Sequence, residues 1–265
     1  MEFNLQLIND STFRSLKVSG RDSSYLFNLG IEIGTLETFF SFENRLLGKS
    51  SQKNLTFKSD AESWEFGGEI IFQKAHIQVS ERGIVSKGNG ERTILINAIN
   101  HSLLMDCVLR FVIPKEQIKV AKIGSQIIKH ERRNKYHQFA SNEVELILYS
   151  GYVIKFTPFE VNLPEGFSSV VYLRDEPKDW ILHFRALSLS PSEYSLKGCI
   201  RWFNRPFPIV IQRFIFKVFP GVRQRLLYVR ERISQRIPIQ VNGASVLRAG
   251  EAIKMSVRWE VKDAS

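Results

Sequence analysis

Short runs in which apolar and polar residues alternate, separated by turn signals, recur along most of this 265-residue chain. Residues 2–8, for example, place Phe3, Leu5 and Leu7 at every second position. This alternation is typical of a half-buried β-strand, because successive strand side chains point to opposite faces. The repetition of such runs at intervals of about 8–15 residues predicts a mainly β fold. We expect a large antiparallel β-sandwich or a barrel-like pair of sheets.

The strongest strand signals lie between residues 55 and 113. Strand-like runs are expected at 63–72, 75–79, 83–86, 93–98 and 103–113. The sequence KGNGE at residues 87–91 predicts a hairpin turn, because Asn and Gly adopt positive φ at little steric cost. Pro114 is expected to end the last of these strands, since proline has no N–H to donate.

Two segments show no single period. Residues 116–130 fit either a short helix or two strands separated at Gly124-Ser125, and residues 209–219 also fit either a strand or a helix. The length of the chain suits a single β-rich unit over residues 1–265. Two lobes, 1–114 and 139–265, joined through 115–138, are the alternative.

Composition places the chain among ordinary globular proteins. Hydrophobic residues make up 43% of it and charged residues 24%, so global disorder is not expected. Cys107 and Cys199 match no zinc pattern or disulfide framework, and both are expected to be buried. The chain shows no secretory leader and no run of about 18 apolar residues. We therefore expect a soluble, cytoplasmic protein, with peripheral attachment to a membrane as an alternative.

Residues 201–236 carry most of the positive charge of the chain. Nine basic side chains and one acid give this stretch a formal charge of +8, out of +10 for the whole chain. Apolar residues at spacings of four, three and four predict a basic amphipathic helix near 222–234. These apolar residues are Val222, Leu226, Val229 and Ile233. The candidate anion-binding residues are Arg213, Lys217, Arg223, Arg225, Arg230, Arg232 and Arg236.

Guanidinium groups suit phosphate and carboxylate, and a basic amphipathic helix suits an anionic membrane surface. The first functional hypothesis is therefore a binding or accessory protein that docks on an acidic partner through residues 201–236. That partner would be an anionic lipid surface or a phosphate-rich molecule. Nucleic acid is a further alternative, which fits the charge but lacks a recognisable binding module. The structural alternative is a helix that packs on the sheet with its arginines in solvent.

The second hypothesis is an enzyme. His130, Tyr136 and His137 lie in a basic segment and could supply a base, an acid and an anion-binding group. Glu143 and Glu145 lie two residues apart in a strand-like run, so they share a face, as a paired-carboxylate site requires. This enzyme would act on a carbohydrate or an apolar small molecule in a cavity lined by Trp and Phe. The structural alternative places all five residues in solvent.

Other conspicuous residues are assigned structural roles. His76, His101 and His183 are isolated from other reactive residues, and Asp175 and Glu176 are expected in a solvated loop. Core packing is expected for the four tryptophans, which are Trp64, Trp180, Trp202 and Trp259. The sequence contains no P-loop, Rossmann, nucleophile-elbow or HExxH motif, so we expect no cofactor and no metal.

Overall fold

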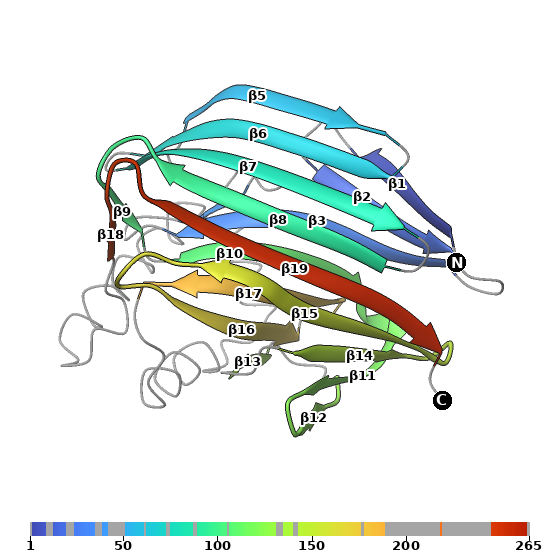
Figure 1. The fold of residues 1–265 in the computed structure, drawn as a ribbon. Helices are drawn as coiled ribbons and strands as arrows, with labels where there is room; N and C mark the ends of the chain where they lie inside the picture. The colour runs from blue at the N-terminus through green and yellow to red at the C-terminus, as the bar shows by residue number, and fades with distance from the viewer. Residues whose placement is uncertain are drawn as a thin grey trace.

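The fold consists almost entirely of antiparallel strands in two large sheets that pack face to face (Figure 1). The computed structural model describes residues 2–8, 13–19, 24–34, 39–41, 51–60, 62–72, 75–86, 89–104, 106–130, 135–139, 143–175, 178–188, 218 and 245–263. The mainly β sandwich predicted from the alternation is thereby confirmed. None of the described segments forms a helix with the length and hydropathy that a membrane span needs.

Within the described residues, one sheet has eight strands, in the order β1-β2-β3-β10-β17-β16-β13, with β4 paired to β3. These strands are β1 (Glu2–Ile8), β2 (Phe13–Ser19), β3 (Ser24–Gly34), β4 (Phe39–Ser41), β10 (Asp106–Pro114), β13 (Lys135–Phe139), β16 (Ser168–Asp175) and β17 (Asp179–Leu187). The sheet therefore joins strands from the first, middle and later parts of the chain.

The facing sheet has nine described strands, in the order β12-β11-β14-β15-β19-β8-β7-β6-β5. These strands are β5 (Ser51–Ser59), β6 (Ser63–Phe72), β7 (Ala75–Ser86), β8 (Asn89–Ala98), β11 (Ile118–Ile123), β12 (Gln126–Ile128), β14 (Val144–Leu148), β15 (Tyr152–Asn162) and β19 (Ala252–Asp263). A short pair, β9 (Ser102–Leu104) and β18 (Ser245–Leu247), lies beside them, and Lys115–Gln117 form a 3-10 turn.

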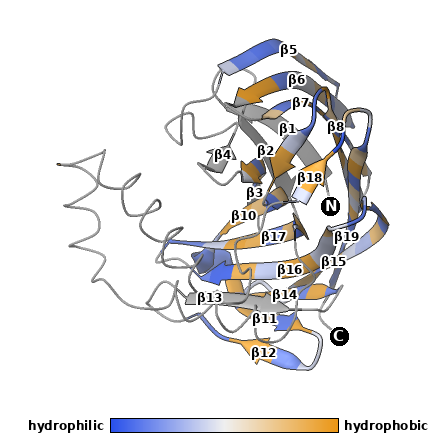
Figure 2. Ribbon diagram, turned by 90° about the vertical axis from the view of Figure 1, so that its left-hand side faces the viewer, coloured by the Kyte–Doolittle hydropathy of each residue, from blue (hydrophilic) through white to orange (hydrophobic). Residues whose placement is uncertain are grey.

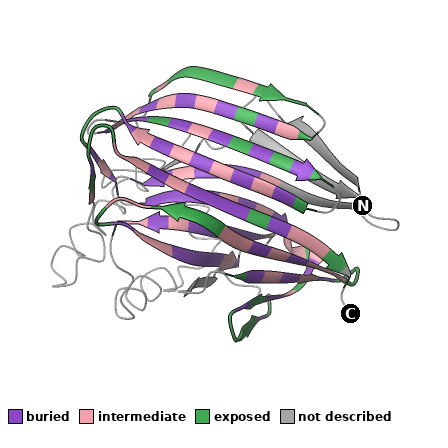
Figure 3. Cartoon of the chain, in the orientation of Figure 1, coloured by how far each residue is buried: buried purple, intermediate pink, exposed green. Residues whose placement is uncertain are grey.

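Alternation along the strands decides which side chains are buried. Along β8, buried residues alternate with less buried ones, and β7 follows the same rule over twelve residues (Figure 3). Figure 2 shows the corresponding succession of hydrophobic and hydrophilic residues along the strands. The inward residues of both sheets form the core. Phe111 of the eight-stranded sheet, for example, lies 4.9 Å from Phe156 and 5.7 Å from Trp259, between ring centres.

Two core tryptophans pack across neighbouring strands onto glycine. Trp64 is the register partner of Gly83, and Trp259 is the register partner of Gly90. A Cβ at Gly83 would lie 1.9 Å from a ring carbon of Trp64, and one at Gly90 would lie 2.0 Å from Trp259. Glycine is therefore required at both positions by close packing. Trp64, Trp180 and Trp259 are fully buried, as expected for core residues, and Trp202 lies outside the described residues.

Some predicted segments differ from the structure. Residues 75–86 form one strand, because Ser80, Glu81 and Arg82 continue the pairing with β6 and β8. Of the two alternatives for residues 116–130, a short helix or two strands, residues 118–128 form two strands. The turn between them is at Gly124, which has a φ of 57°. The expected helix near 222–234 and the segment 209–219, apart from Val218, lie outside the described residues.

Candidate functional site on the outer face of the eight-stranded sheet

The side of the eight-stranded sheet that faces away from the other sheet carries a cluster of charged and polar residues. Along β10, Leu109 and Phe111 point into the core, so Arg110 between them points outward. The same alternation places polar residues outward on β3, β16 and β17. We call this cluster the polar face; it comprises Glu32, Asp106, Arg110, Tyr172, Arg174, His183 and Arg185.

The strand register brings three of these residues into one row. Arg110 is the register partner of His183, and His183 is the register partner of Tyr172. The rings of His183 and Tyr172 lie 5.2 Å apart, between centres. Arg185, two residues further along β17, places its guanidinium 5.0 Å from the centre of the Tyr172 ring. Tyr172 therefore contacts both the imidazole and a guanidinium.

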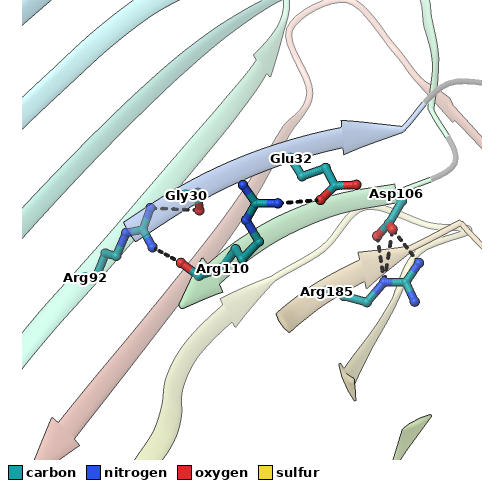
Figure 4. Close-up of polar contacts among 6 residues, drawn as sticks. All are labelled: Gly30, Glu32, Arg92, Asp106, Arg110 and Arg185. Atoms are coloured by element: carbon teal, nitrogen blue, oxygen red, sulfur yellow. Dashed lines mark hydrogen bonds and ion pairs between the residues drawn. The ribbon is translucent and has the colours of Figure 1, made fainter. Parts of the chain in front are cut away.

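Two ion pairs hold the arginines in place (Figure 4). Arg110 Nη1 lies 3.3 Å from Glu32 Oε2, between β10 and β3. Arg185 Nε donates to both carboxylate oxygens of Asp106, at 3.2 and 3.0 Å, and Arg185 Nη2 also contacts this carboxylate. Asp106 is only 3% exposed, so its negative charge depends on this arginine for compensation.

His183 lies among the arginines of the polar face and is itself buried, at 6% exposure. Burial, and then the positive charges of Arg110, Arg185 and Arg174, lower the pKa of His183 well below its ordinary value. The imidazole is therefore neutral at neutral pH. Among the residues that the structure describes, the buried Nε2 atom of His183 has no hydrogen-bond partner.

The polar face has the chemistry of a ligand site. Its described residues include one more guanidinium than carboxylate, and burial raises the pKa of Glu32. Guanidinium groups bind carboxylate or phosphate with planar, paired hydrogen bonds. A neutral imidazole both accepts and donates hydrogen bonds and can transfer protons. The arrangement therefore suits a small molecule with an anionic group and further polar groups.

Of the residues predicted as catalytic, His130 has a partner outside the polar face, and Tyr136 and His137 lie in the strand next to β16. His130 follows β12 and pairs through Nδ1 with Asp175 Oδ1. Tyr136 and His137 lie in β13, where the backbone register pairs them with Arg174 and Leu173. The structure describes the backbone of β13 and not its side chains. Their assignment as acid–base groups remains a prediction.

Glu143 and Glu145 both form ion pairs on the surface of the nine-stranded sheet. Glu143 Oε2 lies 3.0 Å from Lys155 Nζ, and Glu145 Oε2 lies 3.4 Å from Lys122 Nζ. The hydrogen bond that Lys155 donates to Glu143, and then the negative charge of Glu143, raise the pKa of Lys155. Partly exposed pairs of this kind are common on solvated sheets. The structure gives the two carboxylates different lysine partners, and the paired-carboxylate role stays a prediction.

The basic stretch, residues 201–236, lies outside the described part of the chain except for Val218. The candidate anion-binding residues in it are all undescribed, namely Arg213, Lys217, Arg223, Arg225, Arg230, Arg232 and Arg236. Their role in binding an acidic partner therefore stays a prediction. In the part of the chain that is described, no group of three or more His, Cys, Asp or Glu side chains could hold a metal ion.

Sequence reasoning missed the polar face, although a weak signal was present. Charged residues stand alone within apolar strands, as in IEI around Glu32, LRF around Arg110 and HFR around His183 and Arg185. In each run, the alternation with apolar neighbours is what an ordinary solvent-facing strand residue would show. Only the register shows that these residues from β3, β10 and β17 lie side by side.

Comparison with known proteins adds a structural likeness. The sequence matches no protein-family model and no curated protein. Among solved structures, the chain resembles a candidate aldose 1-epimerase of Escherichia coli K12, with a TM-score of 0.46 and 12% sequence identity. The match covers 80% of this chain and 69% of that one. Because β-sandwich folds host many unrelated functions, the chemistry of this chain is argued from its own residues.

Proposed function

We propose that this protein binds, and acts on, a small hydroxyl-bearing anion such as an acidic sugar, at the polar face of its eight-stranded sheet. The observation that carries the proposal is the position of His183. A buried imidazole nitrogen with no partner among the described residues lies in a row between Arg110 and Tyr172. Buried polar groups are normally hydrogen-bonded, and an exception calls for an explanation such as a ligand.

The charges of the polar face support an anionic ligand. Arg110 and Arg185 are held by carboxylates from neighbouring strands, so their guanidinium groups are fixed before a ligand arrives. A fixed binding group loses less conformational entropy on binding than a mobile one. Arg174 adds a third guanidinium near His183, since its charge contributes to the lowered pKa of that residue.

The remaining groups support a ligand with hydroxyl groups. The carboxylates of Glu32 and Asp106 accept hydrogen bonds, the Tyr172 hydroxyl donates or accepts them, and the neutral imidazole of His183 does both. A neutral imidazole in contact with a hydroxyl group can also take up or release its proton, which is the basis of acid–base chemistry. The polar face thus supports the enzyme hypothesis with residues other than those chosen from the sequence.

A calorimetric titration with glucuronate tests the proposal, with glucose, which carries a hydroxymethyl group in place of the carboxylate, as the neutral control. We expect glucuronate to bind and glucose to bind at least tenfold more weakly. His183→Asn should weaken glucuronate binding about tenfold, equivalent to one hydrogen bond of about 1.4 kcal/mol. His101→Asn, a substitution of an exposed histidine outside the polar face, is the matched control and should leave binding unchanged.

A second pair of variants tests the arginines. Arg185→Lys keeps a positive charge beside Asp106 but removes the planar group that stacks on Tyr172. Arg258 is its counterpart on the other sheet, paired with Glu91 and stacked 4.9 Å from the centre of the Phe159 ring. Arg185→Lys should weaken glucuronate binding about tenfold, and Arg258→Lys should not. Equal effects of the two substitutions, or equal affinity for glucose and glucuronate, would contradict the proposal.

A further inference from the structure

A second polar cluster lies on the opposite face of the same sheet, at the ends of β16 and β17. Asp175 and Trp180 are register partners, and both are fully buried. His130, which follows β12 of the other sheet, pairs through Nδ1 with Asp175 Oδ1. Trp180 and His183 are three residues apart on one strand, so their side chains point to opposite faces. The cluster is therefore separate from the polar face.

The pairing with Asp175 determines the hydrogen-bonding role of His130. A carboxylate only accepts hydrogen bonds, so the proton of a neutral His130 lies on Nδ1. Nε2 then carries a lone pair and acts as an acceptor. This atom is buried and has no hydrogen-bond partner among the described residues. His130 Nε2 is therefore a hydrogen-bond acceptor with a fixed orientation, and no described residue donates a hydrogen bond to it.

Trp180 presents the complementary group. Its indole Nε1–H can only donate, and this atom is also buried without a hydrogen-bond partner in the described part of the chain. The rings of His130 and Trp180 lie 6.1 Å apart, between centres, at an interplanar angle of 44°. Two hydrogen bonds of about 2.9 Å through one shared oxygen let their nitrogens stand up to about 5.8 Å apart. The two neighbouring rings thus present one donor and one acceptor, which a single oxygen atom joins where the two nitrogens come within this distance.

We propose that His130, Asp175 and Trp180 form a binding site for one hydroxyl group. Its oxygen accepts a hydrogen bond from Trp180 Nε1–H, and its hydrogen is donated to His130 Nε2. A bridging oxygen of this kind satisfies both buried groups, as ordered waters commonly do. The hydroxyl belongs either to a bound water molecule or to a small polyol, and the two have the same hydrogen-bonding chemistry at this site.

Trp259 provides a matched control within the protein. Its indole Nε1 is also buried without a hydrogen-bond partner among the described residues, but its ring packs against the ring of Phe111. A hydroxyl site formed by the histidine and the indole together should exist at Trp180 and not at Trp259. If water bound at any buried indole N–H, it would be seen at both Trp180 and Trp259.

Nuclear magnetic resonance of the isotope-labelled full chain tests the site. The indole protons are assigned through backbone connectivity and through Trp180→Phe. We expect a nuclear Overhauser effect from a long-lived water to the Trp180 indole proton, and none at Trp259. Long-range proton–nitrogen correlations should show His130 protonated at Nδ1. His130→Phe removes the acceptor and should abolish the water signal at Trp180.

Addition of glycerol distinguishes the two sources of the hydroxyl. If a polyol occupies the site, the water signal at Trp180 is replaced by one from glycerol, and the indole proton shifts. If water occupies it, the signal persists unchanged. The proposal is overturned if the Trp180 indole shows neither signal, or if Trp259 behaves in the same way. None of these results depends on whether glucuronate binds at the polar face.

Discussion

The guanidinium of Arg92, which belongs to β8 of the nine-stranded sheet, donates a hydrogen bond of 2.7 Å to the main-chain carbonyl oxygen of Arg110 in the opposite sheet (Figure 4). The same guanidinium donates at 2.9 Å to the carbonyl oxygen of Gly30, the register partner of Arg110. One buried side chain therefore binds both strands whose outward side chains form the Glu32–Arg110 pair. The polar face is supported from beneath by the interior of the sandwich.

The charge of Arg92 is compensated inside the core. Arg92 Nε and Nη2 each lie 3.0 Å from a carboxylate oxygen of Glu81, and both side chains are fully buried. Trp64 Nε1 donates at 2.6 Å to the same carboxylate. Arg92→Met leaves the Glu81 charge buried without its cation, so it should lower the free energy of unfolding by about 3–5 kcal/mol, measured by urea titration.

A double variant checks this explanation. Glu81→Gln with Arg92→Met removes both charges, while the introduced amide oxygen can still accept the hydrogen bond from Trp64. The double variant should be more stable than Arg92→Met alone, because no unpaired charge remains in the core. Equal or lower stability of the double variant would show that the loss comes from packing or from the inter-sheet hydrogen bonds instead.

Gly83→Ala should lower the free energy of unfolding by about 1–3 kcal/mol, because the added methyl group overlaps the buried Trp64 ring. Gly68→Ala is a matched control on the neighbouring strand, where the methyl group would meet the end of the partly exposed Leu55 side chain. That flexible group can move, so the control should cost less than about 1 kcal/mol. Similar losses for both variants, in urea titrations, would disprove the role of the tryptophan.

Arg185→Leu and Arg258→Leu should differ in their effect on stability, although both remove an arginine from an ion pair and from an aromatic ring. Arg185 compensates the buried Asp106, so its loss should cost about 3–5 kcal/mol. Arg258 and Glu91 are 49% and 42% exposed, and loss of this pair should cost less than about 1 kcal/mol. Thermal unfolding of the two variants beside the parent protein measures the difference.

The lowered pKa of His183 predicts a pH dependence of stability. As the pH falls below about 6.5, the unfolded chain protonates this histidine and the folded protein does not. The unfolded state then binds more protons, so the free energy of unfolding falls with pH in this window. The pKa of Glu32 is raised in the folded protein, and this has the opposite effect. It lowers the free energy of unfolding as the pH rises above about 4.5.

His183→Asn should therefore make the stability less dependent on pH between 7.0 and 5.5. Urea titrations at both values, with His101→Asn as the control, measure the change. Glu32 is present in both variants, so its contribution cancels in the comparison. A decline in stability between pH 7.0 and 5.5 that is the same in His183→Asn and in the parent would contradict a neutral, buried His183.

The sequence predicted the strands well because burial in a sandwich imposes a period of two, which is a local property. Trp64 and Phe66 share one face of a predicted strand, and both are buried in the structure. It did not predict the continuous strand at 75–86, because Glu81 interrupts the apolar pattern. That interruption is explained by Arg92, eleven residues away, which lies beside Glu81 in the core.

The candidate sites required information that no local pattern contains. His183 looked isolated because its neighbours Arg110 and Tyr172 come from other strands. Asp175, expected in a solvated loop, is fully buried, because it ends β16 and pairs with His130. The basic surroundings of His130 in the sequence favour a catalytic role, but its partners in the structure are the carboxylate of Asp175 and the indole of Trp180. Only the strand register and the packing of the two sheets bring these residues together.

The most direct test of the ligand site is a crystal structure of the protein with glucuronate. We expect the ligand to lie on the outer face of β10, β16 and β17, with its carboxylate at a guanidinium of the polar face and a hydroxyl group within hydrogen-bond distance of His183 Nε2. Glucuronate bound on another surface, with the His183 imidazole still lacking a partner, would contradict it.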